Sequence, residues 1–307
     1  MVNSRLVELI RNLSLTELQE FRLFVGSPYF NRGNFSRETS VLLDIIIAAA
    51  PDFNDQKLHR EYAYQAIFPH QPPVEGKLDK VMSELHKMLK EFIAVSRFQR
   101  PENEFGRLLN EAVYYRTNAL NNRYANVIQR LKTSLSNITR RDQEYYQRAF
   151  QLDYEILSFE SLSNQKRDDM HIRNTLQSLD LQYFFAKTEL LCMYLLQQKV
   201  ARLPIPEEMA NAFGHDQLPG RYSNDHPALL IYYRIYQLLE KGETEVSDFE
   251  HLHQLLRQHE NRIDPKLLQL FYTYVRNFCV LLVNQGLSQF LPVLFTVQKE
   301  HIEKGYM

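Results

Sequence analysis

The chain of 307 residues carries 36 basic and 37 acidic side chains, and 44% of its residues are hydrophobic. This nearly neutral balance gives no overall field that would draw the chain to nucleic acid or to an anionic membrane, so only local charged patches could do so. The hydrophobic fraction is ordinary for a globular protein and excludes wholesale disorder.

Targeting and membrane segments are not expected. Charged side chains interrupt every apolar run near the start, unlike in a secretory signal, and the run at residues 41–50 is much shorter than the roughly 20 residues of a membrane span. Cys192 and Cys279 lie far apart in apolar helical stretches, which favours two buried reduced thiols over a disulfide. We therefore expect a cytoplasmic protein that makes no contact with a membrane.

Helical periodicity dominates the chain, which has only nine glycines and no alternating run of β-branched residues between turns. The first clear boundary is Ser14, which forms a capping box with Glu17 and begins a helix that ends at Gly26. Tyr29 and Phe30 follow in a loop and are expected to close it onto the core. Three further helices are predicted at about residues 36–49, 55–68 and 77–98, and residues 1–100 form a helical N-terminal module.

Longer helices with short polar breaks are predicted in the middle region, residues 101–201. Its last segment, residues 168–201, fits either one helix on the order of 50 Å long or two helices that meet near residues 178–180. Prolines and glycines then gather in residues 202–226. This segment is predicted to be a linker or long loop with room for one short helix at about residues 207–213.

Residues 227–307 are predicted to form helix hairpins, with helices at about 227–241, 247–261, 265–285 and 288–304. Asp264 can cap the third of these helices, Pro265 suits its first position, and Gly286 offers the left-handed turn that ends it. A lone hairpin leaves one apolar face uncovered and must stack on its neighbours. The predicted fold is therefore all-α, with the hairpins stacked as an α-solenoid.

The last hairpin resembles a tetratricopeptide unit, and the resemblance covers about residues 226–307. The residues that match its packing positions are Val275, Phe278, Cys279, Leu282 and Phe295. The preceding hairpin matches at Ile231, Ile235 and Leu238 but has Arg234 where an apolar residue is expected. The two hairpins also start about 38 residues apart, whereas the family repeats every 34 residues or so.

In tetratricopeptide arrays the first helix of each hairpin lines a concave groove that holds a protein or peptide partner. Carried over to this chain, the resemblance implies that the groove is lined by Tyr232, Tyr236, Arg276, Asn277 and Asn284. Tyrosine and arginine are favoured anchors in interfaces, and asparagine can bond a partner's backbone. The alternative is that the two tyrosines only pack the next layer of helices.

A second resemblance rests on residues 26–31 (Gly-Ser-Pro-Tyr-Phe-Asn), 81–89 and 179–187. These segments resemble an uncharacterised family of all-helical proteins of Bacteroidota. The resemblance implies a helical fold without indicating a mechanism, and it implies that longer relatives continue with further helices. An uncapped last hairpin would gain from stacking on a second copy, so self-association through the C-terminal hairpin is predicted.

The motifs of common enzyme classes are missing, and we predict no catalytic residue, cofactor or metal. Glu250-x-x-His253 has the spacing of a di-iron ligand pair, with Asp168-x-x-His171 as its nearest counterpart, but both fit a solvated helix face as well. Four carboxylates stand in apolar surroundings, where structural ion pairs are expected: Asp44, Glu155, Asp180 and Glu189. Arg173 and Lys187 are the expected partners of Asp180.

The predicted function is that of a non-enzymatic helical-repeat scaffold that binds a protein or peptide in its groove. The alternative is a DNA-binding regulator with a helix-turn-helix-like segment at residues 57–100, whose second helix carries several lysines. Interleaved acidic residues largely cancel that charge, and the connection at residues 70–76 is longer than the usual turn. Nucleic acid is therefore not the expected partner.

Overall fold

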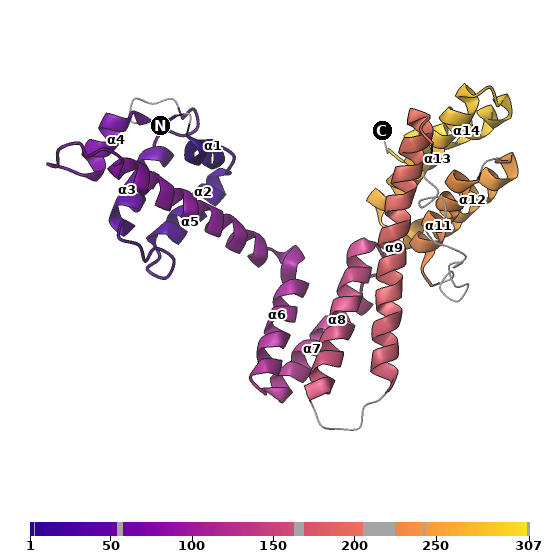
Figure 1. The fold of residues 1–307 in the computed structure, drawn as a ribbon, viewed down its shortest axis with the longest axis horizontal. Helices are drawn as coiled ribbons and strands as arrows, with labels where there is room; N and C mark the ends of the chain where they lie inside the picture. Colours follow the sequence, from indigo (N-terminus) through magenta and orange to yellow (C-terminus); the bar gives the residue numbers. More distant parts are fainter. Residues whose placement is uncertain (3, 54–57, 163–168, 205–224, 242–243, 306–307) are drawn as a thin grey trace. The chain divides into compact units, whose positions relative to one another are not determined.

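The computed structural model describes residues 1–2, 4–53, 58–162, 169–204, 225–241 and 244–305, without the side chains of residues 162–170. The described residues form thirteen α-helices and no strand, which confirms the predicted all-α class. The chain divides into two compact units, Met1–Arg107 (unit 1) and Leu108–Met307 (unit 2), and Figure 1 shows the helices of each. The first unit thus extends a few residues beyond the predicted N-terminal module.

Unit 1 is built around one long helix. Its helices are α1 (Arg5–Arg11), α2 (Leu15–Gly26), α3 (Ser36–Ile47), α4 (Arg60–Ile67) and α5 (Lys77–Gln99). α5 packs against α1, α2 and α3, and α3 also packs against α2 and α4. Helix α6 (Glu104–Thr117) begins in unit 1 and continues into unit 2.

The ends of α2 follow the sequence signals closely. The Ser14 hydroxyl accepts a hydrogen bond from the Glu17 amide at 3.2 Å, and the Glu17 carboxylate accepts one from the Ser14 amide at 2.9 Å. The predicted capping box is therefore confirmed. The backbone hydrogen bond from Ser14 is also the main reason why the pKa of Glu17 is lowered.

The loop after α2 packs only one of its two aromatic rings against the core. Phe30 stacks on Phe24 with ring centroids 4.0 Å apart, whereas Tyr29 is 67% exposed and lies beneath the Arg32 guanidinium. The Asn31 amide donates to the carbonyl oxygens of Val25 and Ser36, both at 2.9 Å. This side chain ties the end of α2 to the start of α3. The expectation that Tyr29 also closes the loop onto the core was wrong.

Helix α1 was not expected before Ser14. It has two turns, which is too short to display a clear apolar period, yet it buries Leu6, Val7 and Ile10. Ser4 caps it by accepting a hydrogen bond from the Val7 amide at 3.3 Å.

Unit 2 contains the longer helices. They are α7 (Asn121–Ser136), α8 (Gln143–Leu162), α9 (Asp169–Ala201), α11 (Pro227–Glu240), α12 (Val246–His259), α13 (Pro265–Asn284) and α14 (Leu291–Glu303). The segment that fitted one helix or two is a single helix of 33 residues, α9. Figure 1 shows α9 alongside α8, and the two pack against each other.

The core of unit 2 joins the predicted middle region to the predicted hairpins. α9 packs against α11 and α13, α11 packs against α12 and α13, and α14 packs against α12 and α13. Large fully buried rings fill the space between these helices: Tyr146, Phe185, Tyr232, Phe249, Phe271, Tyr272 and Phe290. Most of the predicted linker, including the short helix expected at residues 207–213, lies outside the described residues.

The boundaries of α13 agree with their predicted signals. The Asp264 carboxylate accepts from the amides of Lys266 at 2.9 Å and Leu267 at 3.4 Å, and Pro265 occupies the first turn. Gly286 has a φ of 93°, the left-handed conformation that suits glycine. The final helix starts later than expected because residues Ser288–Phe290 form a 3₁₀ turn before α14.

Candidate functional site

Helix α9 carries apolar side chains on two opposite faces. Its inner face is buried in the core of unit 2 through Leu181, Phe185, Cys192 and Leu195. Its outer face carries seven large apolar side chains, each between 42% and 61% exposed, which we call the α9 stripe: Ile172, Leu176, Leu179, Tyr183, Leu190, Met193 and Val200. A helix that is apolar all round is normally buried on every side. The α9 stripe is thus a feature that the packing among the described residues of unit 2 does not account for.

The spacing of the α9 stripe is that of a coiled coil. Successive members lie alternately four and three residues apart, and Ala186 and Gln197 occupy the two remaining positions of this series. Over residues 172–200 the pattern completes four heptads with a period of 3.5 residues, which keeps one seam facing a partner helix when the two helices supercoil. The sequence interpretation missed this pattern, although the spacing is visible in the chain.

The middle of the stripe forms a shallow apolar groove of about 730 Å³. Its walls come from α9 alone, between Leu179 and Tyr194. The Oε1 atom of Gln182 lies buried at this groove and accepts no hydrogen bond within the described part of the chain. Such a surface offers area for apolar contact and almost no polar groups for holding a small charged ligand.

Charged side chains follow one edge of the stripe at seven-residue intervals: Arg173, Asp180 and Lys187. Asp180 is exposed, and the ion pairs found among the described residues do not include it, so the partners predicted for Asp180 are not observed. Two helical turns separate these residues, which is too far for direct pairing on one helix. Lys187 instead donates to the Tyr183 hydroxyl at 2.6 Å.

Tyr232 and Tyr236 lie in the core of unit 2. Tyr232 is fully buried, with its ring 4.6 Å from that of Phe271, and its hydroxyl donates to Glu189 at 2.9 Å. Burial, followed by the nearby Glu189 carboxylate, raises the pKa of Tyr232. Tyr236 is buried too and donates to Glu240 at 2.6 Å.

This burial corrects the picture of an open groove along α11. Helix α9 packs over the face of α11 that the tetratricopeptide resemblance placed on the groove, and the Cys192 thiol donates to the Tyr232 carbonyl oxygen at 3.4 Å. The two tyrosines therefore contact the neighbouring layer of helices, which was the alternative interpretation.

The three groove residues expected on α13 are less buried. The Arg276 guanidinium donates to the Asn277 side chain at 3.2 and 3.3 Å and lies 3.4 Å from a His301 ring nitrogen. Arg276 and Asn277 are half-buried, and Asn284 is exposed at the end of α13. That these three residues contact a partner stays a prediction.

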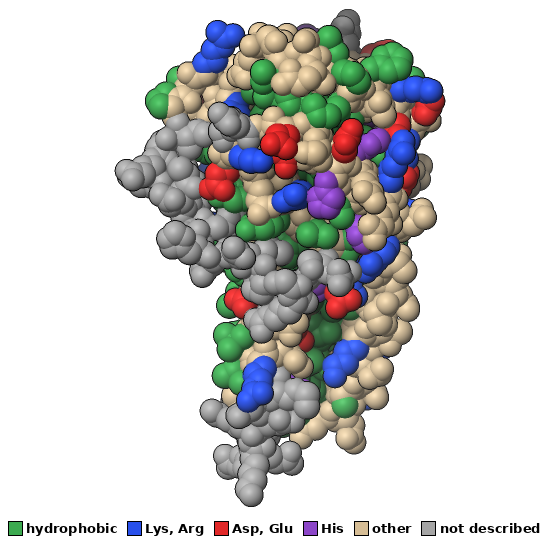
Figure 2. Space-filling model, turned by 90° about the vertical axis from the view of Figure 1, so that its right-hand side faces the viewer, with side chains coloured by type: hydrophobic (Ala, Val, Ile, Leu, Met, Phe, Trp, Pro, Cys, Tyr) green, Lys and Arg blue, Asp and Glu red, His purple; other side chains and the backbone are tan. Residues whose placement is uncertain are grey.

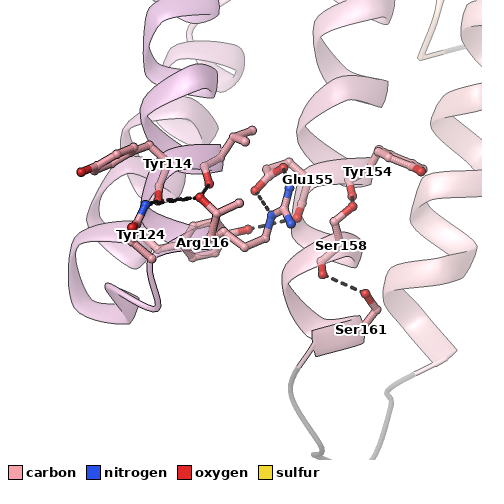
Figure 3. A network of polar contacts seen from close by, with 10 residues as sticks. Tyr114, Arg116, Tyr124, Tyr154, Glu155, Ser158 and Ser161 are labelled. Carbon is pink, nitrogen blue, oxygen red and sulfur yellow. Dashed lines mark hydrogen bonds and ion pairs between the residues drawn. The ribbon is translucent and has the colours of Figure 1, made fainter.

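Three of the four carboxylates in apolar surroundings have structural partners. Asp44 pairs with Arg22 at 2.8 Å on the surface of unit 1. Glu155 is buried and accepts two hydrogen bonds from Arg116, as Figure 3 shows. Glu189 accepts the hydrogen bond from Tyr232 described above. These three carboxylates therefore take part in contacts within the fold, as expected for structural residues.

The candidate metal ligands contact other side chains. His253 Nε2 lies 2.6 Å from the Glu300 carboxylate, to which Arg257 also donates, and Glu250 is exposed. His171 lies 3.2 Å from Glu160, while Asp168 is outside the described residues. Within the described ranges no three His, Cys, Asp or Glu side chains are grouped as metal ligands. Both cysteines are buried free thiols.

The helix-turn-helix-like segment corresponds to α4 and α5. Helix α5 is largely occupied by core packing, since Leu78, Val81, Leu85, Met88, Leu89 and Phe92 are all buried. Of the basic side chains, Lys77 donates to Gln71 at 2.5 Å and Arg100 pairs with Glu17 at 3.3 Å. DNA binding by this segment stays a prediction.

A second exposed apolar surface lies on α14. Leu291, Phe295 and Ile302 follow helical spacing on its outer side, and Phe295 is 73% exposed. Figure 2 shows hydrophobic side chains gathered at the end of unit 2 where α13 and α14 lie. This is the surface for which self-association was predicted, and that prediction stays untested.

Comparisons with protein-family models, with curated proteins and with solved structures give no match to this chain. None of the helices in the described ranges combines the length and the apolar character that crossing a membrane requires.

Proposed function

We propose that this protein is a non-enzymatic interaction protein whose α9 stripe binds a helical segment of a protein partner. The observation that carries the proposal is the run of seven large, half-exposed apolar side chains at heptad spacing along one face of α9. Removing apolar surface from water is favourable by roughly 25 cal/mol per Å² before the entropic costs of association are subtracted, so covering this face provides a driving force for binding.

Recognition on this surface is helix against helix. The partner contributes apolar side chains at i, i+3, i+4 and i+7, which interdigitate with the α9 stripe. Because α9 is anchored along its inner face, the stripe is preformed and loses little entropy on binding. No covalent step and no cofactor takes part. The proposed site thus differs from the groove that the sequence placed along Tyr232 and Tyr236.

We further propose that α11 to α14 are two stacked hairpins of the α-solenoid type. In support, α11 pairs with α12 and α13 pairs with α14, while α11 packs on α13 and α12 packs on α14. A reducing, cytoplasmic environment is part of the proposal, since both cysteines are buried and free.

The proposal is tested with a photo-cross-linking amino acid placed at Leu190, in the centre of the stripe. Leu270 on α13, which is also an exposed apolar position, receives the same amino acid as the control. We expect the cross-linker at position 190 to form protein adducts in the native cells. These adducts should disappear when the substitution Met193→Lys is added, and the cross-linker at position 270 should form none. If position 190 gives no adduct with any protein, a second copy of this chain included, the proposed function is wrong.

A further inference from the structure

We infer that the occupant of the α9 stripe is the same stripe of a second copy, so that two α9 helices form an antiparallel coiled coil. The inference rests on the proposed function and identifies the partner that binds the α9 stripe. It is drawn from the arrangement of charges and side-chain sizes along the stripe.

In an antiparallel pair, the a positions of one helix face the d positions of the other. The a positions are Leu176, Tyr183, Leu190 and Gln197, and the d positions are Ile172, Leu179, Ala186, Met193 and Val200. With the twofold axis near the middle of α9, Tyr183 faces Ala186 of the second copy and Leu190 faces its Leu179. A large ring thus meets a small side chain at the centre, which gives layers of even volume.

A parallel pair would pack less evenly. It would bring Tyr183 against the same residue of the second copy, and Ala186 likewise, so a crowded layer would lie next to an underfilled one. The side-chain sizes along the stripe therefore favour the antiparallel orientation.

The charges along the edge of the stripe select the same orientation. Arg173, Asp180 and Lys187 occupy successive e positions, and e faces e in an antiparallel pair. In the register above, Asp180 meets Lys187 of the second copy, and symmetry repeats this contact on the other side of the axis. A parallel pair would bring Asp180 near Thr175 and Lys187 near Gln182, so no opposite charges would meet.

The length of the seam suits a stable dimer. Residues 172–200 span about 42 Å of helix, and a heptad pattern sustained over four repeats is typical of coiled coils that form in water. The stripe also lies opposite the inner face of α9, since Leu181, Phe185 and Leu195 point into the core. The pairing therefore leaves the fold of unit 2 unchanged.

The first test measures the mass of the purified full-length protein by light scattering and sedimentation at about 1–100 µM. We expect a dimer for the wild type and a dissociation constant raised more than about 100-fold by Leu190→Lys, which removes one apolar side chain from each copy. Phe295→Lys is the matched control, because it changes a large, exposed apolar side chain on α14 and should leave the dimer intact. A dimer lost with Phe295→Lys and kept with Leu190→Lys would move the interface to the C-terminal hairpin and overturn the inference.

Charge exchange provides a readout that does not depend on how well Leu190→Lys folds. Asp180→Lys alone and Lys187→Asp alone each place like charges together twice per dimer, so each should raise the dissociation constant about tenfold at low salt. The double variant Asp180→Lys/Lys187→Asp should restore wild-type affinity. Additive weakening in the double variant would contradict the proposed register.

Disulfide trapping reports the orientation. Tyr183→Cys and Ala186→Cys proteins, each made separately, should cross-link efficiently when mixed and poorly alone, because position 183 faces position 186 only in the antiparallel pair. Efficient cross-linking of each protein with itself would indicate a parallel pair and overturn the inference.

The two proposals fail in different ways. A wild-type chain that stays monomeric at 100 µM while position 190 cross-links to another protein would refute self-pairing and leave the proposed function standing. A monomer without any adduct would refute both proposals.

Discussion

The guanidinium of Arg116 on α6 donates two hydrogen bonds, at 2.7 and 3.2 Å, to the carboxylate of Glu155 on α8 (Figure 3). Glu155 is only 5% exposed, and its carbonyl oxygen accepts a further hydrogen bond from the Tyr124 hydroxyl at 3.1 Å. This cluster links α6, α7 and α8 of unit 2. At this depth the attraction between the two charges offsets the cost of removing each of them from water. The effect of losing one member therefore depends on whether the other is still present.

We expect Glu155→Ala to lower the free energy of unfolding by about 3–5 kcal/mol, because it leaves the Arg116 charge without its partner in a largely buried position. The double change Arg116→Met/Glu155→Leu should cost much less, since apolar side chains of similar size replace both charges. Urea denaturation followed by circular dichroism measures both values. The exposed Asp44–Arg22 pair is the control, and Asp44→Ala should cost less than about 1 kcal/mol. Equal losses at Glu155 and Asp44 would show that burial does not set the strength of these pairs.

His226 at the start of α11 should make the stability of unit 2 depend on pH. Its ring nitrogen Nδ1 lies 3.0 Å from the buried Tyr146 hydroxyl. Burial first, and then the positive charge of Arg141, lower the pKa of His226 to about 4. The unfolded chain has the usual histidine pKa of about 6.5, so it binds more protons than the folded chain between these two values. The stabilisation is therefore complete above pH ~6.5 and is lost as the pH falls towards ~4.

The size of this pH effect is at most about 3 kcal/mol for a shift of that extent. It is measured as the difference in unfolding free energy between pH 7 and pH 4.5 for the wild type and for His226→Gln. The variant should be less stable at pH 7 and should show a flatter profile in this window. A wild-type profile that is flat from pH 7 to pH 4.5 would mean that His226 is accessible to protons in the folded chain.

Glu300 on α14 contacts side chains of α12 and α13. Its contribution to the stability of unit 2 should be lost at a lower pH than that of His226. Its carboxylate lies 2.6 Å from His253 Nε2 on α12, accepts from the Tyr272 hydroxyl on α13 at 3.1 Å, and also accepts from Arg257. Burial alone would raise the pKa of Glu300, but the hydrogen bonds from Arg257 and His253 outweigh it and lower the pKa. Its contribution to stability is therefore present above the ordinary glutamate pKa of about 4.3 and is lost as the pH falls through the lowered value.

We expect Glu300→Gln to cost about 2–3 kcal/mol at pH 7, because charge-assisted hydrogen bonds are lost, and Tyr272→Phe to cost about 1 kcal/mol. Guanidinium denaturation at pH 7 and at pH 3.5 checks the values. The difference between Glu300→Gln and the wild type should shrink at the lower pH. A difference that stays constant would show that the carboxylate charge does not matter for this contact.

Local signals in the sequence predicted the local structure well. Ser14, Asp264 and Gly286 act through neighbours a few residues away, so the chain itself contains the reason for each helix boundary. The burial of Tyr232, in contrast, could not be predicted from local signals. It depends on α9 packing over α11, a contact between segments about 40 residues apart that no local pattern encodes.

The α9 stripe shows a different obstacle. Its heptad spacing stands in the sequence, but the buried inner face of the same helix carries an apolar pattern of its own. With Leu181, Phe185 and Leu195 on one side and the stripe on the other, the two periodicities overlap and neither dominates. Only the structure distinguishes the apolar side chains of α9 that are buried in the core from those that remain exposed.

Two glycines should respond to substitution with opposite signs. Gly286 has a φ of 93°, and a Cβ placed there would meet no atom within 4 Å, so Gly286→Ala costs only backbone strain, about 1–2 kcal/mol. Gly286→Asn should cost less, because asparagine tolerates this conformation better than alanine. Gly26 is the last residue of α2, lacks a positive φ and also has open space around it. Gly26→Ala should therefore stabilise unit 1 by about 0.5–1 kcal/mol.

Because the two glycines lie in different compact units, amide hydrogen exchange is the suitable measurement, since it reports the opening free energy of α2 and α13 separately. Faster exchange in α13 with Gly286→Ala and slower exchange in α2 with Gly26→Ala are the expected results. If both substitutions slowed exchange, the turn at Gly286 would not require the left-handed conformation. The hairpin of α13 and α14 would then depend on packing around Phe290 and not on its turn.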